Sequence, residues 1–340
     1  MPHGHPRQRA RLDELLAGPV RWDELVTMAE NENMGGLLWL HLRDIVDLPE
    51  DTRLRLMGLH MRRRALTQFQ EEAIARILDV AAGIGVEVML LKGAALRRLA
   101  YAGAELRPMR DIDVLASADD GRRLHDALAG AGFARVDPKA HPIHHPMLLW
   151  QQDGFGVGVD IHWVTHAKWP AAFDDLALRG TRIDVLGRPA WVPSRVDLLR
   201  HVFLHAFGSD LWLGSRMVAI ADLVAMIETS SEALDERRLS RRDRALVRAL
   251  GWLDLLTPLS DTARARVGSG ECPGSRGVGE FYTGWPLESS ASPLRSWPDF
   301  LATCAPSPWW LRLRYRSRRG LLPLALAWVR HVNDVFWVWR

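Results

Sequence analysis

The sequence predicts an α+β protein in which a small mixed β-sheet is flanked by N-terminal and C-terminal helical regions. Apolar residues recur at helical spacing before residue 83, short β-rich runs alternate with helical stretches between residues 83 and 193, and helical spacing returns from residue 194. We therefore divide the chain into an N-terminal helical region (1–82), an α+β core (83–193) and a C-terminal helical region (194–340). The last region contains a glycine-rich loop near 268–284.

The first predicted elements are helices. Leu12, Leu15 and Leu16 begin the helical spacing of apolar residues, and Leu37–Leu42 continue it. Gln68–Ala82 forms a further amphipathic stretch, which ends at Gly83. These patterns predict that helices precede the sheet.

The predicted core alternates strands with helices. Its strands are expected at Val86–Leu91, Asp111–Leu115, Gly156–Val164, Ile183–Leu186 and Ala190–Val192. Its helices are expected at Ala94–Tyr101 and Asp119–Ala131, with a loop at Gly103–Arg107.

The C-terminal region is predicted to be helical from Ser194 to about Leu256 and again near the chain end. The apolar run Leu321–Trp339 is interrupted by Pro323, Arg330 and Asp334, so a docked or interfacial helix is expected and no transmembrane span. The segment that precedes it carries Arg312, Arg314, Arg316, Arg318 and Arg319 after Trp309 and Trp310. It is either a solvated helix with buried tryptophans or a basic contact for an acidic partner, such as RNA or acidic lipid.

Composition excludes a disulfide scaffold and favours phosphate-bearing ligands. The 340 residues are 48% hydrophobic and 25% charged, as in ordinary globular proteins, and the net charge of +3 with a pI of 9.2 makes the surface mildly basic. There are only two cysteines, Cys272 and Cys304, and the N-terminus lacks the apolar core of a secretory signal. We therefore expect a cytoplasmic protein.

Three carboxylates form the main candidate site. Asp111 and Asp113 lie two residues apart in a predicted strand and therefore share one face, and Asp160 lies in a later strand. A solvated edge strand would also explain Asp-x-Asp, but Lys92-Gly93 at a strand-to-helix turn adds a place for phosphates. Carboxylates beside phosphates are typical of two-metal phosphoryl transfer with Mg²⁺ or Mn²⁺.

These motifs resemble one family. The segments Leu91-Lys92-Gly93-Ala94, Arg107-Pro108-Met109-Arg110-Asp111-Ile112-Asp113 and Val159-Asp160-Ile161-His162 are similar to the uncharacterised nucleotidyltransferase family of the DNA polymerase β superfamily. The resemblance implies a nucleotidyltransferase core in which Asp111, Asp113 and Asp160 are the catalytic metal ligands. It covers most of the chain, and it is specific only in these motifs.

The resemblance also implies the residues that bind substrate. Lys92, Gly93, Ala94 and Arg107 are the expected nucleotide-binding residues, although the superfamily often has serine where Ala94 stands, which removes a hydroxyl. Arg110 and His162 are candidates for binding the acceptor or supporting the metal site, and a purely structural role for His162 is equally compatible. A second group, His141, His144 and His145, is expected to form an exposed loop between prolines.

The predicted function is metal-dependent transfer of a nucleoside monophosphate from an NTP, most simply ATP, to a small-molecule, protein or RNA acceptor. One alternative is a non-catalytic descendant that binds a nucleotide or a partner. Another is a glycosyltransferase that uses Asp-x-Asp, which would require a nucleotide-binding α/β domain before the motif; the N-terminal helical region disfavours it.

Overall fold

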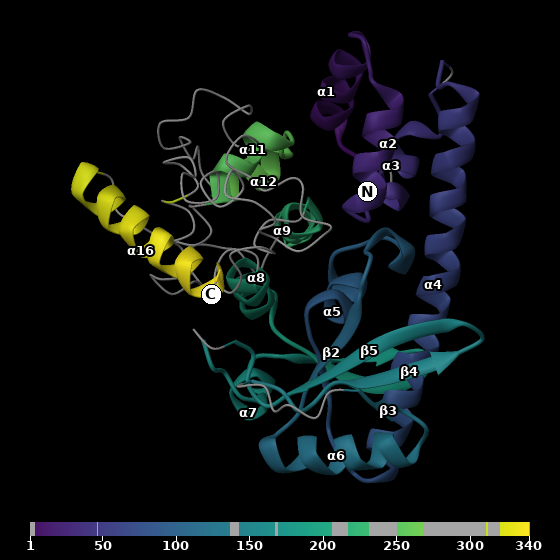
Figure 1. The fold of residues 1–340 in the computed structure, drawn as a ribbon, viewed down its shortest axis with the longest axis vertical. Helices are drawn as coiled ribbons and strands as arrows, with labels where there is room; N and C mark the ends of the chain where they lie inside the picture. Colours follow the sequence, from purple (N-terminus) through teal and green to yellow (C-terminus); the bar gives the residue numbers. More distant parts are fainter. Residues whose placement is uncertain are drawn as a thin grey trace. The chain divides into compact units, whose positions relative to one another are not determined.

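The computed structural model describes residues 4–45, 47–136, 143–166, 169–205, 217–230, 250–267, 311 and 320–339. Contacts divide the chain into two compact units (Figure 1). One comprises Met1–His5 and Leu12–Val202, and the other comprises Pro6–Arg11 and Phe203–Arg340. The glycine-rich loop, the basic segment 312–319 and His141 lie outside the described residues, and the three-part division of the chain remains a prediction.

The first unit is built on a seven-stranded mixed sheet in the order β3-β4-β5-β2-β1-β7-β6. Pairing is parallel between β2 and β5 and between β1 and β7, and it is antiparallel between the other neighbours. The strands are β1 (Met89–Leu90), β2 (Asp111–Leu115), β3 (Ala134–Arg135), β4 (Leu148–Gln152), β5 (Phe155–His162), β6 (Thr181–Val185) and β7 (Arg188–Val192). Together with the flanking helices, this sheet confirms the predicted α+β class.

Two tight hairpins fix the register of β4 with β5 and of β6 with β7. Asp153 and Gly154 join β4 to β5, and Leu186 and Gly187 join β6 to β7; all four residues have positive φ, between 51° and 81°. Two successive positive φ angles make a two-residue turn whose twist matches that of the strands. The predicted strands Ile183–Leu186 and Ala190–Val192 overlap β6 and β7, but the turn between them is shorter than predicted, because Arg188 and Pro189 belong to β7. β3, β4 and the short helix α7 (Phe173–Ala177) were not predicted.

Helices precede the sheet, as predicted. They are α1 (Pro6–Leu16), α2 (Trp22–Asn31), α3 (Gly35–Leu42) and the 34-residue α4 (Glu50–Gly83). Val26, Leu42, Leu48 and Leu56 form a buried apolar cluster among α2, α3 and α4. Further along α4, Ile74 and Ile77 are fully buried.

One face of β2 is apolar, and the other carries the two aspartates. Ile112 and Val114 of β2 are 0% exposed, and they lie on the face opposite Asp111 and Asp113. Helix α6 (Ala118–Gly130), below the strands in Figure 1, packs against β5. Its first turn is capped by Ser117, whose Oγ accepts a hydrogen bond from Asp120 N at 3.2 Å.

Helix α5 (Lys92–Leu99) follows β1 directly, and it begins two residues before the predicted start. Its Ala94, Ala95 and Leu96 are at most 1% exposed, so they anchor the start of the helix against the core. The backbone at Leu91 is fixed as well, because Leu91 N donates to Asp113 O at 3.0 Å. The residues at the start of α5 are therefore held beside the carboxylates of β2.

The second unit is helical in the part that the structure describes. Its elements include the end of α8 (Arg195–Leu204), α9 (Met217–Thr229), α11 (Leu253–Leu256), α12 (Asp261–Val267) and α16 (Leu321–Trp339). Ser260 joins two of them, because its N and Oγ donate to Glu228 at 2.8 and 2.6 Å. Among the described residues, no helix has the length and apolar character needed to cross a membrane.

Candidate functional site

The parallel pairing of β2 and β5 sets the geometry of the site. Asp113 lies in register with Asp160, Asp111 with Gly158 and Leu115 with His162. Because side chains alternate along a strand and registered partners share a face, both aspartates of β2 point to the same side as Asp160 and His162. Strand pairing thus brings side chains from two separate segments into one cluster.

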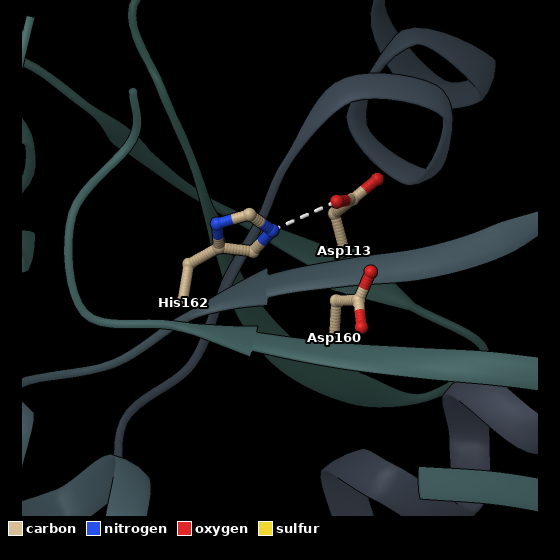
Figure 2. A group of neighbouring side chains, drawn as sticks. All are labelled: Asp113, Asp160 and His162. Atoms are coloured by element: carbon tan, nitrogen blue, oxygen red, sulfur yellow. Dashed lines mark hydrogen bonds and ion pairs between the residues drawn. The ribbon is translucent and has the colours of Figure 1, made fainter. Parts of the chain in front are cut away.

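Figure 2 shows Asp113, Asp160 and His162 converging from the two neighbouring strands. Each offers one ligand atom, and these atoms lie within 4.8 Å of one another. His162 Nε2 is 2.9 Å from Asp113 Oδ1, and both side chains are almost fully buried. Asp111 stands outside this compact group, so the structure gathers two of the three predicted carboxylates and adds a histidine.

This donor set fits a divalent cation. Asp160 Oδ1 is buried and has no hydrogen-bond partner among the described residues, which is costly for a carboxylate oxygen unless a cation satisfies it. Carboxylates suit Mg²⁺ and Mn²⁺, and imidazole suits several transition metals. The group of Asp113, Asp160 and His162 could therefore hold a metal ion, while the donor types alone leave the identity of the ion open.

Lys92 supplies the positive charge of the cluster. It is the first residue of α5, and its Nζ lies 2.6 Å from Asp113 Oδ1. Its φ of +39° falls in the left-handed region that residues with side chains rarely adopt. The residue predicted to contact phosphate is thus paired with a carboxylate, and the unusual backbone of the turn belongs to Lys92 instead of Gly93.

The charges in this cluster shift one another's pKa values. The negative charge of Asp113, together with burial, raises the pKa of Asp111 to about 6. Burial and the Asp113 charge also raise the pKa of Asp160. Burial opposes ionisation of Asp113, but the Lys92 ammonium and the His162 hydrogen bond outweigh it and hold the Asp113 pKa well below its usual range. Burial would lower the pKa of Lys92, yet the carboxylates, Asp113 foremost, raise it. The site therefore carries excess negative charge.

Gly93 is required by packing against the loop that leads into β2. A Cβ on Gly93 would lie 2.5 Å from Met109 Cγ and 2.9 Å from Arg107 Nη1, both too close for a real contact. Arg107 is half-buried, and its guanidinium donates to the carbonyl of Pro108, whereas Arg110 is exposed. Ala94, the residue without a hydroxyl, is buried. The structure thus places Gly93 and Arg107 together.

The buried side chain of Arg97 supports the loop that leads into β2. The Arg97 side chain is 0% exposed; its Nε donates to Arg107 O at 2.9 Å and its Nη1 to Glu71 at 3.1 Å. Gln70 Nε2 donates to Met109 O at 3.0 Å. Burial lowers the pKa of Arg97 to about 10, but the guanidinium remains charged. This network links α4 and α5 to the residues that precede Asp111, and sequence patterns gave no indication of it.

The histidines before β4 are not in an exposed loop, which corrects the prediction for His144 and His145. His145 N donates to Ile161 O at 2.8 Å, so this segment pairs beside the end of β5. As a result, His144 Nδ1 lies 3.8 Å from Asp160 Oδ1, and its ring centroid is 5.2 Å from that of His162. The cluster of histidines was visible in the sequence, but its contact with the carboxylates depends on this pairing.

His145 lies on the other side of the segment. Its ring meets Trp163 edge-on with centroids 5.0 Å apart, and Nε2 is buried without a hydrogen-bond partner among the described residues. Burial lowers its pKa to about 4. The charged and titratable groups that face it are His125, Arg122, His144 and Asp126. This ring is therefore neutral at physiological pH, and its role is to pack.

Three comparisons with known proteins bear on the family of this chain. A search of curated proteins found no match. Among solved structures, an antigenic nucleotidyltransferase-like protein from Paracoccidioides brasiliensis is similar over 58% of this chain and 93% of its own, with 18% identity and a TM-score of 0.41. The profile of the family described as "Uncharacterised nucleotidyltransferase" matches residues 18–262, which is more than half of the chain and includes every residue of the candidate site. The chain therefore belongs to this nucleotidyltransferase family.

Proposed function

We propose that this protein is a metal-dependent nucleotidyltransferase that moves a nucleoside monophosphate from an NTP, most simply ATP, to an acceptor and releases pyrophosphate. The observation that carries the proposal is the convergence of Asp113, Asp160 and His162 beside Lys92, in a chain of a nucleotidyltransferase family. The acceptor is a small molecule, a protein or RNA.

In this proposal the residues of the site have separate roles. Asp113, Asp160 and His162 hold a divalent cation, Mg²⁺ or Mn²⁺, and Asp111 extends the anionic strip along β2. When bound, the cation neutralises phosphate charge and orients the reacting oxygens. The turn at Lys92 and Gly93, with Ala94 and Arg107 beside it, receives the phosphates; Arg110 is available at the rim for the acceptor.

The reaction is an exchange of bonds at the α-phosphorus. An acceptor oxygen forms a bond to this phosphorus, the bond to the bridging oxygen breaks, and pyrophosphate leaves while the acceptor loses its proton to solvent. The site contributes position and charge more than covalent chemistry. His144, which lies 3.8 Å from Asp160 Oδ1, borders the same space and is a further candidate for contacting the acceptor.

The direct test is incubation of the purified protein with each NTP, labelled on the α-phosphate, and with Mg²⁺ or Mn²⁺. Release of pyrophosphate together with transfer of label to added RNA, to small molecules or to the protein itself would support the proposal. Asp113→Asn is the inactive control, and Asp119→Asn, at an exposed aspartate of α6, is its matched active control. Binding of nucleotide without release of pyrophosphate in any condition would favour the non-catalytic alternative, with which the alanine at position 94 is compatible.

A further inference from the structure

The cluster already contains a cation where the proposed metal would bind. Lys92 Nζ is 2.6 Å from Asp113 Oδ1, and the same oxygen lies 2.9 Å from His162 Nε2. The side chains of Lys92 and Asp113 are 17% and 4% exposed. The ammonium therefore neutralises, within a largely buried site, the oxygen that belongs to the candidate metal group.

Lysine is a rare choice in this chain. Of the 44 lysine and arginine residues only three are lysines, and the other two, Lys139 and Lys168, lie outside the described residues. An arginine fork would hold a carboxylate through two parallel hydrogen bonds, whereas an ammonium is a compact point charge on a flexible four-carbon stem. A lysine therefore suits a cation that must leave its partner.

The backbone of Lys92 is fixed while its side chain keeps a path to solvent. The neighbouring Leu91 N–H is bonded to Asp113 O at 3.0 Å, and Ala95 N donates to Leu91 O at 3.2 Å. The partial exposure of the Lys92 side chain shows that it reaches the edge of the cluster. Rotation of the stem can therefore move the ammonium without moving the turn.

We propose that Lys92 is an exchangeable counter-cation. In the free protein it neutralises Asp113; when a divalent cation and an NTP bind, its ammonium leaves Asp113 Oδ1 and pairs with a phosphate of the nucleotide. This inference rests on the proposed function. Its physical basis is that two cations at one carboxylate oxygen repel each other, while the phosphates supply a new anionic partner for the lysine. Metal and nucleotide should consequently bind cooperatively, each raising the affinity for the other.

The test compares the wild-type protein with Lys92→Met, which keeps the length of the stem without its charge, and with Lys92→Arg, which keeps the charge. Mn²⁺ binding is measured by calorimetry with and without a non-hydrolysable NTP. Without nucleotide, Lys92→Met should bind Mn²⁺ about tenfold more tightly than wild type, because one repelling charge is gone. With Mn²⁺ present, the same variant should bind the nucleotide more weakly. Unchanged Mn²⁺ affinity, or unchanged nucleotide affinity, would overturn the exchange.

A second measurement does not depend on the stability of Lys92→Met. Wild-type protein labelled with ¹³C at the lysine ε-carbons has three labelled positions, and Lys92→Arg identifies the signal of Lys92 by its loss. Mg²⁺ with the non-hydrolysable NTP should shift this signal. A stationary signal under conditions in which calorimetry detects nucleotide binding would refute the movement.

The two proposals fail in different ways. If wild type binds no Mn²⁺, or if Asp113→Asn binds it as well as wild type, the metal site is wrong and the exchange is overturned with it. If wild type binds Mn²⁺ through Asp113 but Lys92→Met shows no gain, the exchange alone is overturned.

Discussion

Gly93→Ala tests how the turn between β1 and α5 is packed against the loop before β2. The added Cβ would lie 2.5 Å from Met109 Cγ and 2.9 Å from Arg107 Nη1. Carbon atoms pack best at about 3.5–4.0 Å, so Met109 has to move. Its room is limited, because Met109 is 5% exposed and its carbonyl accepts a hydrogen bond from Gln70 at 3.0 Å.

The expected magnitude follows from two opposing effects. Overpacking a filled core costs about 1–3 kcal/mol, while replacement of a helical glycine by alanine contributes about 0.5–1 kcal/mol through the unfolded chain. We therefore expect Gly93→Ala to lower the free energy of unfolding by about 0.5–2 kcal/mol. Gly58→Ala is the matched control, because Gly58 lies within α4 and a Cβ there would meet no atom within 4 Å in the described structure. The free energy of unfolding of Gly58→Ala should rise by about 0.5–1 kcal/mol.

Urea denaturation followed by circular dichroism measures both variants, and a double-mutant cycle with Met109→Ala assigns the cause. Met109→Ala alone should cost about 2–5 kcal/mol because it leaves a cavity. In the double variant, the methyl group introduced at position 93 would fill part of that space. The free energy of unfolding of the double variant should therefore exceed, by about 1 kcal/mol, the value expected from adding the effects of the two single changes. If Gly93→Ala is stabilised as much as Gly58→Ala, or if the two changes are additive, the packing described for this turn is wrong.

Three further predictions concern the carboxylates, the half-buried His145 and the hydrogen-bond network of Arg97. Asp113→Asn should reduce metal-dependent release of pyrophosphate by at least about 100-fold, since it removes an anionic ligand, while its far-ultraviolet spectrum stays that of the wild type. Burial lowers the pKa of His145 to about 4, so the unfolded chain takes up an extra proton as pH falls from 6.5 towards 4, and the free energy of unfolding falls with it. In His145→Phe this part of the pH dependence should disappear from thermal melting curves, and an unchanged pH dependence would contradict the assignment. Arg97→Met should lower the free energy of unfolding by about 2 kcal/mol or more, because Arg107 O and Gln70 Oε1 lose their donor, although Glu71 keeps its ion pair with Arg98. Arg122→Met, which removes an exposed ion pair, should change the free energy of unfolding by less than about 1 kcal/mol. Equal losses in urea denaturation of these two variants would argue against the buried network.

The elements that were predicted well are those with a strong local signal. β2 coincides with the predicted Asp111–Leu115, and β5 differs from its predicted span by one residue at the start and two at the end. β5 alternates strictly between apolar and polar or small residues, and β2 alternates from Asp111 to Val114. β1 is much shorter than the predicted Val86–Leu91, because only Met89 and Leu90 pair as strand residues. A run of β-forming residues reports propensity, whereas the length of a strand depends on its neighbours.

The missed elements carry weaker signals. β4 (Leu148–Gln152) reads as Leu-Leu-Trp-Gln-Gln, which does not alternate, and β3 and α7 have only two and five residues. The turn Asp153-Gly154 was the available indication, since Asp-Gly between two strand-forming runs favours a two-residue hairpin. Pairing with β5 then makes β4 a strand despite its own pattern.

Spacing and motifs predicted that Asp111 and Asp113 share a face, that a lysine and a glycine follow the first strand of the core, and that the chain resembles nucleotidyltransferases. The first two predictions follow from spacing within single segments, where the geometry of a strand or turn is local. The third follows from the similarity of three motifs to a known family. The tertiary structure adds that β5 pairs with β2 in parallel, so that Asp160 and His162 lie in one compact group with Asp113. It also decided that Lys92 meets Asp113 and that His144 approaches Asp160. Strand register and neighbouring charges could not be predicted in this way, because they arise from contacts between residues far apart in the chain, which no local spacing encodes.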